Sequence, residues 1–140
     1  MSYQSVLFVS SADQVGDSEA LRNLCDTFGE ARDTLQLLYV GEHHVTGFGA
    51  TIAHGHIAND MQIRQEIFPQ LKRICDRNRI PSDRINIRLG DRTQAIENFI
   101  SDYRIELLAL APSFVRDHPG TLRHLTQLLR QCNCELHVSP

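Results

Sequence analysis

Residues 90–111, "GDRTQAIENFISDYRIELLALA", decide the fold of this chain. Directly after a Gly-Asp pair that suits a turn and a helix cap, apolar side chains recur at helical spacing, on Ala95, Ile96, Phe99 and Ile100. The segment ends in "IELLALA", an unbroken apolar run that is typical of a strand buried on both faces. Residues 90–111 therefore predict a helix that leads into a central strand of a parallel sheet.

The same alternation of strands and helices extends in both directions along the chain. "SVLFVS" at 5–10 and "LQLLYV" at 35–40 predict two further strands, whereas "INIRL" at 85–89 and "CELHV" at 134–138 alternate apolar and polar residues, as half-exposed edge strands do. We therefore expect one α/β domain over residues 1–140, an open parallel sheet with helices on both faces.

Three more amphipathic segments predict the other helices. Their apolar faces contain Ala20, Leu21, Leu24 and Phe28 in the first, Met61, Ile67, Phe68, Leu71, Ile74 and Cys75 in the second, and Leu122, Leu125, Leu128 and Leu129 in the last. A loop is expected from Gly41 to about Ala58, and residues 112–119 read as a Pro-punctuated loop. Pro69 is expected to bend the second helix near Gln65, because its ring displaces the carbonyl four residues back.

Composition excludes several classes of protein. The 140 residues carry a net charge of -3 and a pI near 6.1, so nothing attracts the chain generally to nucleic acid or to an anionic membrane. No signal peptide and no bilayer-spanning run is recognisable, which favours a cytoplasmic protein. The four cysteines, Cys25, Cys75, Cys132 and Cys134, lack zinc-type or thioredoxin-type spacing and are expected to be idle or buried thiols.

The ends of two predicted strands mark the place for a ligand. Open parallel sheets bind ligands beyond the carboxyl ends of their strands, where the winding direction reverses. If the first strand is central, this place lies between "VSSAD" at 9–13 and "LAPSF" at 110–114. Ser10, Ser11 and Ser113 fall there, but no motif sets a histidine beside them. We expect their hydroxyls to bond the main chain at the strand ends, and we expect no enzymatic activity.

The order and spacing of these segments resemble the universal stress protein family over nearly the whole chain. "SYQSVLFVSSAD" is similar to the opening strand of the family, "LQLLYV" to its second strand, "LGDRTQAIENFISDYRIELLALA" to its Gly-Asp, helix and strand segment, and "GTLRHLTQLLRQCNCELHV" to its closing helix and strand. The resemblance implies the adenine nucleotide alpha hydrolase-like fold, with five parallel strands in the order 3-2-1-4-5, and a homodimer.

Nucleotide-binding members of that family carry an acidic residue after the first strand and, after the fourth, a G-x-x-G, nine residues and G-[ST]. Here Ser11 stands at the acidic position and Ala111 and Phe114 stand at the glycine positions. Only five residues separate Phe114 from Gly120-Thr121. A phenylalanine cannot take the backbone conformation and close approach that a phosphate loop needs from glycine. The resemblance therefore implies a degenerate nucleotide motif and weak or absent ATP binding.

Three functions stay open at this point. The first is a cytoplasmic stress-response dimer that binds a protein partner and no cofactor. The second is an adenine-nucleotide protein that binds AMP, or ATP together with Mg²⁺, at the positions matched by the resemblance, Ser11, Val40, Ala111, Gly120 and Thr121. Only this second function leaves room for weak ATPase activity or autophosphorylation. Thr121 is also a candidate N-cap of the last helix, which competes with a phosphate role. The third is a metal site that uses Glu42, His43, His44, His54 and His56 of the long loop.

The closing segment, Cys134 to Val138, is the candidate dimer interface. Its alternation sets Glu135 and His137 on one face and Cys134, Leu136 and Val138 on the other. An edge strand has unpaired main-chain groups, and antiparallel pairing with its own copy across a twofold axis satisfies both copies at once.

Overall fold

A five-stranded parallel sheet forms the centre of the molecule. The computed structural model describes residues 3–41 and 52–139, with side chains for 3–41 and 60–139. The strands pair in the order β3-β2-β1-β4-β5, which confirms the predicted fold class and strand order. Their bounds are Val6–Val9 for β1, Leu35–Gly41 for β2, Ile85–Leu89 for β3, Leu107–Leu110 for β4 and Glu135–Val138 for β5.

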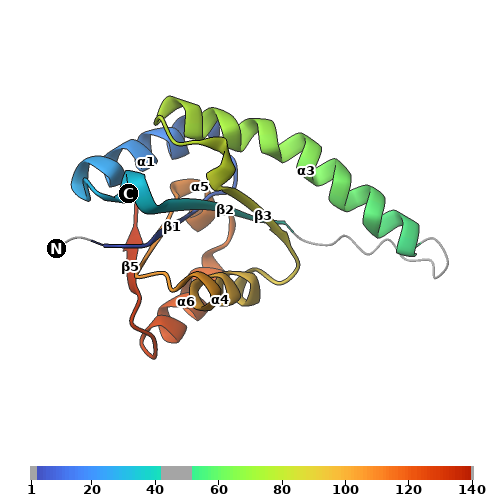
Figure 1. The fold of residues 1–140 in the computed structure, drawn as a ribbon. Coiled ribbons are helices and arrows are strands. Elements are labelled where there is room, and N and C mark those ends of the chain that lie inside the picture. Colours follow the sequence, from blue (N-terminus) through green and yellow to red (C-terminus); the bar gives the residue numbers. More distant parts are fainter. Residues whose placement is uncertain (1–2, 42–51, 140) are drawn as a thin grey trace.

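Helices cover both faces of this sheet. Figure 1 shows α1 and α3 on one side of the strands and α4 and α6 on the other. The helices are α1 (Gln14–Thr27), α2 (Ala31–Thr34), α3 (Ile52–Arg77), α4 (Arg92–Tyr103), α5 (Pro112–Asp117) and α6 (Pro119–Leu129), with a short 3-10 turn at Ser82–Arg84. Within residues 3–41 and 52–139, none of these helices combines the length and the hydropathy that crossing a bilayer requires.

The central strand β1 shows why its sequence is apolar throughout. Val6 and Phe8 pack into the core beneath α1 and α3, whereas Leu7 and Val9 pack into the core beneath α4 and α6, and all four are fully buried. Successive side chains of a strand point to opposite faces, so a strand covered on both faces needs an apolar residue at every position. The strand β4 is buried in the same way, as "IELLALA" predicts.

Two expected loops are helical instead. The connection after β2 was expected to run to about Ala58, but α3 already begins at Ile52. Residues 112–117 form α5 with Pro112 at its first turn, where the missing amide hydrogen of proline costs nothing because that amide has no helical partner. Proline therefore starts this helix, and the expectation of a loop was wrong.

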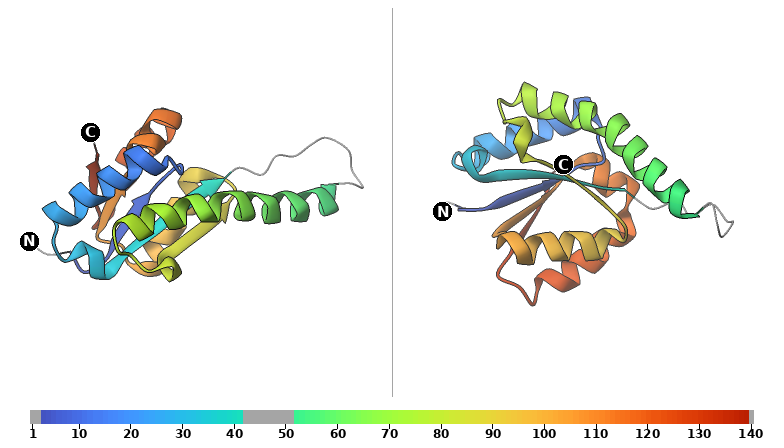
Figure 2. Two further views of the ribbon diagram at one scale, coloured as in Figure 1. Left: turned by 90° about the horizontal axis from the view of Figure 1, so that it is seen from above. Right: turned by 45° about the vertical axis from the view of Figure 1, so that its right-hand side comes forward.

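Pro69 lies inside α3, and the helix continues through it. This continuity confirms the helix predicted around Phe68. The helix curves along its length in Figure 1, and Pro69 supplies a cause, because it has no amide hydrogen to donate to the carbonyl of Gln65. Figure 2 shows α3 extending well beyond the end of the sheet.

Candidate functional site

The winding of the sheet reverses between β1 and β4. The helix that follows β1, α1, lies on one face of the sheet, and α6, which follows β4 and the short α5, lies on the other face beside α4 (Figure 1). In an open α/β sheet, the crevice beyond the carboxyl ends of two such strands is the usual ligand site. The structure therefore brings Ser10 and Ser11, after β1, close to Ala111 and Ser113, after β4, as the sequence predicted.

A buried polar network fills this crevice. The Asp17 carboxylate, in the first turn of α1, is fully buried and accepts hydrogen bonds from the Ser10 and Ser113 hydroxyls, with both Oγ atoms 2.5 Å from Oδ2. The main-chain N–H of Ser113 also donates to Asp17 Oδ1, over 3.3 Å. Hydrogen bonds to a carboxylate are among the strongest in proteins, so the Ser10–Asp17–Ser113 network ties β1, α1 and α5 together.

The two serines also bind the main chain beside them. Ser10 Oγ accepts from the N–H of Ala12, and Ser113 Oγ accepts from the N–H of Ser11, each over 2.9 Å. This arrangement confirms the expected role for both hydroxyls. The turn between β1 and α1 passes through Ala12 at a φ of 70°, a conformation that a residue with a Cβ seldom adopts. The amide groups that a ligand would need at this turn therefore point into the protein.

The residues matched to the nucleotide motif lie on four segments of the chain: β2, the turn after β1, the start of α5 and the first turn of α6. Val40 is buried in the core under α4 and α6, and Ala111 is buried at the start of α5, where its N–H bonds Val9 O over 2.9 Å. Ser11 is half-buried, and its main-chain N–H donates to Ser113 Oγ. Gly120 and Thr121 belong to the first turn of α6, one helix further along.

Two further expectations concern the loop after β4. Thr121 does not cap α6, because the helix begins at Pro119 and the residue at its N-cap position is His118. The N-cap expectation was wrong because Pro119 opens the helix two residues earlier. Phe114 stands where the nucleotide motif has its second glycine. Its side chain is 1% exposed and packs in the core.

Asp17 is the site residue that the sequence analysis missed. It lies three and four residues before Ala20 and Leu21 of α1, so it falls on the apolar face of that helix. An acidic residue on an apolar helix face is the available signal, because a buried carboxylate requires partners. Its neighbour Asp13, by contrast, is partly exposed and pairs with Arg116 at 3.6 Å.

The proposed metal ligands mostly lie outside the described part of the chain. Glu42, His43 and His44 are not described, and His54 and His56 are described only as backbone of α3. Two positions that are two residues apart do not share a helix face, so the helical backbone weakens the pairing of His54 with His56. Within residues 3–41 and 60–139 no three His, Cys, Asp or Glu side chains gather as a metal site. Stabilisation by zinc that is lost in a His54→Ala, His56→Ala variant remains the test of this prediction.

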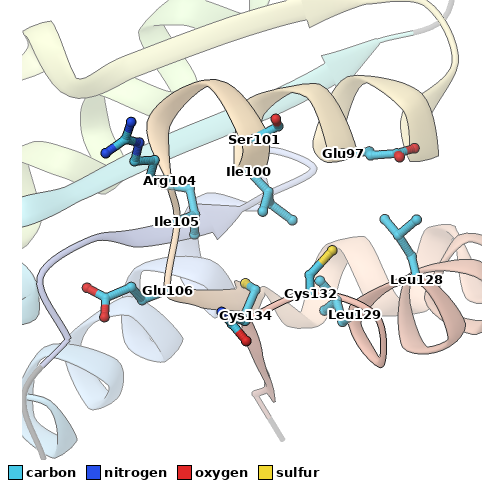
Figure 3. A pocket seen from close by; sticks show the side chains of 11 residues that line it. Glu97, Ile100, Ser101, Arg104, Ile105, Glu106, Leu128, Leu129, Cys132 and Cys134 are labelled. Atoms are coloured by element: carbon cyan, nitrogen blue, oxygen red, sulfur yellow. The ribbon is translucent and has the colours of Figure 1, made fainter.

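A cavity of about 480 Å³ lies at the opposite, amino end of the sheet. Figure 3 shows Ile100 of α4 facing Leu128 and Cys132 across this space, with Cys134 beside them. Cys134 is 7% exposed, and burial raises the pKa of its thiol to about 11, so at neutral pH it is a protonated thiol. Cys132 is exposed, and neither thiol is in a disulfide.

Comparison with solved structures points to one fold. No protein-family model and no curated protein matches the sequence. Among solved structures, the universal stress protein UspA from Lactobacillus plantarum matches over 100% of this chain and 99% of its own, at a TM-score of 0.66 and 17% identity.

Two other solved structures match almost as completely. A protein of the universal stress protein family from Burkholderia pseudomallei matches over 98% of this chain and 96% of its own, at a TM-score of 0.57 and 18% identity. A universal stress protein in complex with cAMP matches over 100% of this chain and 99% of its own, at a TM-score of 0.55 and 13% identity. Together with the strand order and the position of the winding reversal, these matches show that the chain has the fold of the universal stress proteins.

Proposed function

We propose that this protein acts in the cytoplasm in a stress response, as a homodimer that binds a protein partner, does not bind ATP and catalyses no reaction. The fold shared with universal stress proteins supports the stress-response role. The observation that carries the absence of ATP binding is the buried Asp17 carboxylate, which lies where the fold usually receives a ligand.

The Ser10–Asp17–Ser113 network opposes a bound phosphate in two ways. It engages the N–H groups of Ala12, Ser11 and Ser113, so these donors are not available to an anion. A phosphate at this place would also lie against a carboxylate, and two like charges in a water-poor crevice repel each other strongly.

Calorimetry tests this part of the proposal. ATP with Mg²⁺ is titrated into the purified protein, and no binding is expected at the micromolar concentrations where a nucleotide site would saturate. The universal stress protein crystallised with cAMP, titrated with cAMP, serves as the control for the method. A micromolar dissociation constant for ATP corresponds to about -8 kcal/mol and would contradict the proposal.

An adenine-nucleotide-binding protein is the second candidate, because a protein of this fold is known in complex with cAMP. In this candidate, Gly120 and Thr121 offer the first amides of α6 to a phosphate, and Ser11, Val40 and Ala111 lie near the nucleotide. Such binding requires the Ser10–Asp17–Ser113 network to open. An Asp17→Ala variant that binds ATP while the parent protein does not would show that the network closes an existing site.

The dimer is proposed to form through β5. The N–H groups of Glu135 and Ser139 bond β4, to Glu106 O and Leu110 O over 2.9 and 3.2 Å. Main-chain groups alternate in direction along a strand, so the N–H and C=O groups of Leu136 and Val138 face away from the sheet. The side chain of Leu136 packs on the α4 and α6 side, and His137 packs edge-on against Phe28 on the other side. This agrees with the two faces that the sequence predicted.

A proline at Leu136 tests this interface. Leu136→Pro removes an N–H that faces outward and leaves the bonds between β4 and β5 in place, so the variant should fold and be monomeric. Leu136→Ala removes the same side chain but keeps the N–H, and it should stay dimeric. Light scattering on the two variants decides the point, since a dimeric Leu136→Pro protein would mean that the interface lies elsewhere.

A further inference from the structure

The second open edge of the sheet is β3, and its outward main-chain groups can be assigned. The N–H of Gly90 donates to Gly41 O of β2 over 2.9 Å. By the alternation along a strand, Asn86 and Arg88 also face β2, whereas the N–H and C=O groups of Ile87 and Leu89 face outward. No strand within residues 3–41 and 52–139 pairs with this outer side. An edge of this kind can accept another extended chain.

An apolar groove runs beside these outward groups. It has a volume of about 470 Å³ and lies between α3 and β3, lined by Arg64, Gln65, Phe68, Pro69, Ile85 and Ile87. The side chain of Ile87 is buried and Ile85 packs on the same core, so both face α3. Phe68 is 39% exposed, a large share for an aromatic side chain that would be covered in a finished core. A chain added along β3 would place alternate side chains in this groove.

Two polar groups at the groove show what the added chain should carry. Arg64 is exposed, and among the described side chains it forms no ion pair and no hydrogen bond. The carbonyl of Gln65 lacks its usual helical donor, because Pro69 has no amide hydrogen. The groove thus presents a positive charge that forms no ion pair among the described side chains, beside apolar walls, which favours an acidic residue on the same face of the added strand as its apolar residues.

We propose that the β3 edge is a docking site for an extended segment of a partner protein, with apolar residues at alternate positions and an acidic residue that meets Arg64. Main-chain bonds to Ile87 and Leu89 supply affinity, and the groove beside α3 supplies specificity. The proposal rests on the partner-binding function above and names its surface. A second copy fits less well, because residues 84–90 of β3 and its ends carry Arg84 and Arg88 but no acidic residue that could meet Arg64.

A labelled peptide tests this site. The probe is a fluorescein-labelled peptide Asp-Thr-Val-Thr-Val-Thr, in which Asp and both Val residues lie on one face of an extended strand, and its matched control has Lys in place of Asp. Fluorescence anisotropy should show binding of the Asp peptide to the parent protein. Arg64→Glu should weaken this binding by about tenfold or more and should favour the Lys peptide instead. Arg22→Glu, a charge reversal on an exposed position of α1, should leave the binding of both peptides unchanged.

Hydrogen exchange distinguishes pairing along β3 from a general effect of charge, because charge alone does not protect individual main-chain amides. On binding the peptide, the amides of Ile87 and Leu89 should exchange more slowly, while the amide of Arg88, already bonded to β2, should not change. Absence of binding at about 1 mM peptide, or binding that is equal in the parent and Arg64→Glu proteins, would overturn the proposal. Protection of Ile87 and Leu89 that rises with protein concentration alone would also overturn it, because the edge would then pair with a second copy. Neither result bears on ATP binding, which calorimetry decides separately.

Discussion

The two ends of the sheet differ in how their space is filled. At the carboxyl end, where an open α/β sheet usually holds its ligand, the fully buried Asp17 joins Ser10 and Ser113 across β1, α1 and α5. At the amino end, α4 and α6 finish over a cavity of about 480 Å³ that contains Cys132 and Cys134. Topology fixes where a crevice arises, but individual side chains decide whether it stays open.

The chain turns differently at each end. At the amino end, α4 ends at Arg104 in the left-handed conformation, at a φ of 51°, and the N–H of Ile105 bonds back to Ile100 O over 3.0 Å. This helix end satisfies its own carbonyls and needs no side chain from α6 to do so. At the carboxyl end, the turn at Ala12 depends on Ser10, and Ser10 depends on Asp17. Removing Asp17 should therefore disturb more than one element.

The largest expected effect is that of Asp17→Ala. The variant leaves the Ser10 and Ser113 hydroxyls buried without their acceptor, and it should lose about 3 kcal/mol of the free energy of unfolding. Asp13→Ala is the matched control, because Asp13 lies four residues away and pairs with Arg116 at the surface, a contact worth about 1 kcal/mol at most. Urea unfolding compares the two variants. Equal losses would mean that the buried network contributes no more than a surface ion pair.

The next effect concerns alkaline pH and contrasts buried thiols with the ordinary thiol of an unfolded chain. Burial raises the pKa of Cys134 to about 11 and that of Cys75 to about 12, from 9.0. The folded protein keeps these protons at a pH where the unfolded chain has released them. Their stabilising contribution is thus complete below pH 9.0 and is lost as the pH rises toward 11 and 12.

Unfolding free energies measured across this range check the prediction. The parent protein should lose stability steadily above pH 9.0, and Cys134→Ala should lose less over the same interval because one of the thiols with a raised pKa is gone. Each variant is compared with itself at neutral pH, so that the packing lost with the side chain cancels. Identical slopes for the two proteins would show that the thiol at the amino end is not shielded from water.

A smaller effect, at the carboxyl end, is expected from the cap of α4. Asp91 Oδ1 accepts from the N–H of Gln94 over 2.8 Å, as the Gly-Asp pair in the sequence predicted. Asp91→Ala should cost about 1 kcal/mol of stability. Asp102→Ala removes the same group from the last turn of the same helix, where a negative charge opposes the helix dipole, and it should cost nothing. Thermal unfolding separates the two, and a loss in both would point to the carboxylates rather than to the cap.

The sequence predicted those features that depend on neighbours along the chain. The continuous strands β1 and β4, the alternating β3 and β5, and the Asp91 cap all follow from patterns within a few residues. The strand order came from the resemblance to a family, since periodicity alone does not order strands. The carboxyl-end network was not predicted, because Asp17 and Ser113 are 96 residues apart and meet only in the folded sheet. The start of α3 was misplaced because Gly47, Gly49 and Gly55 read as loop residues.

The last prediction leaves stability unchanged and compares two thiols of one cavity. Cys132 and Cys134 both line the amino-end cavity, but Cys132 is exposed and Cys134 is 7% exposed with a raised pKa. Because a thiolate attacks alkylating reagents and a buried thiol rarely forms one, Cys132 should react first at neutral pH, and Cys132→Ser should abolish the fast reaction. Cys25 and Cys75 should also react slowly, since burial raises the pKa of both. Mass spectrometry after brief iodoacetamide treatment assigns the labelled site. Equal labelling of Cys132 and Cys134 would show that water and small molecules reach the floor of the cavity.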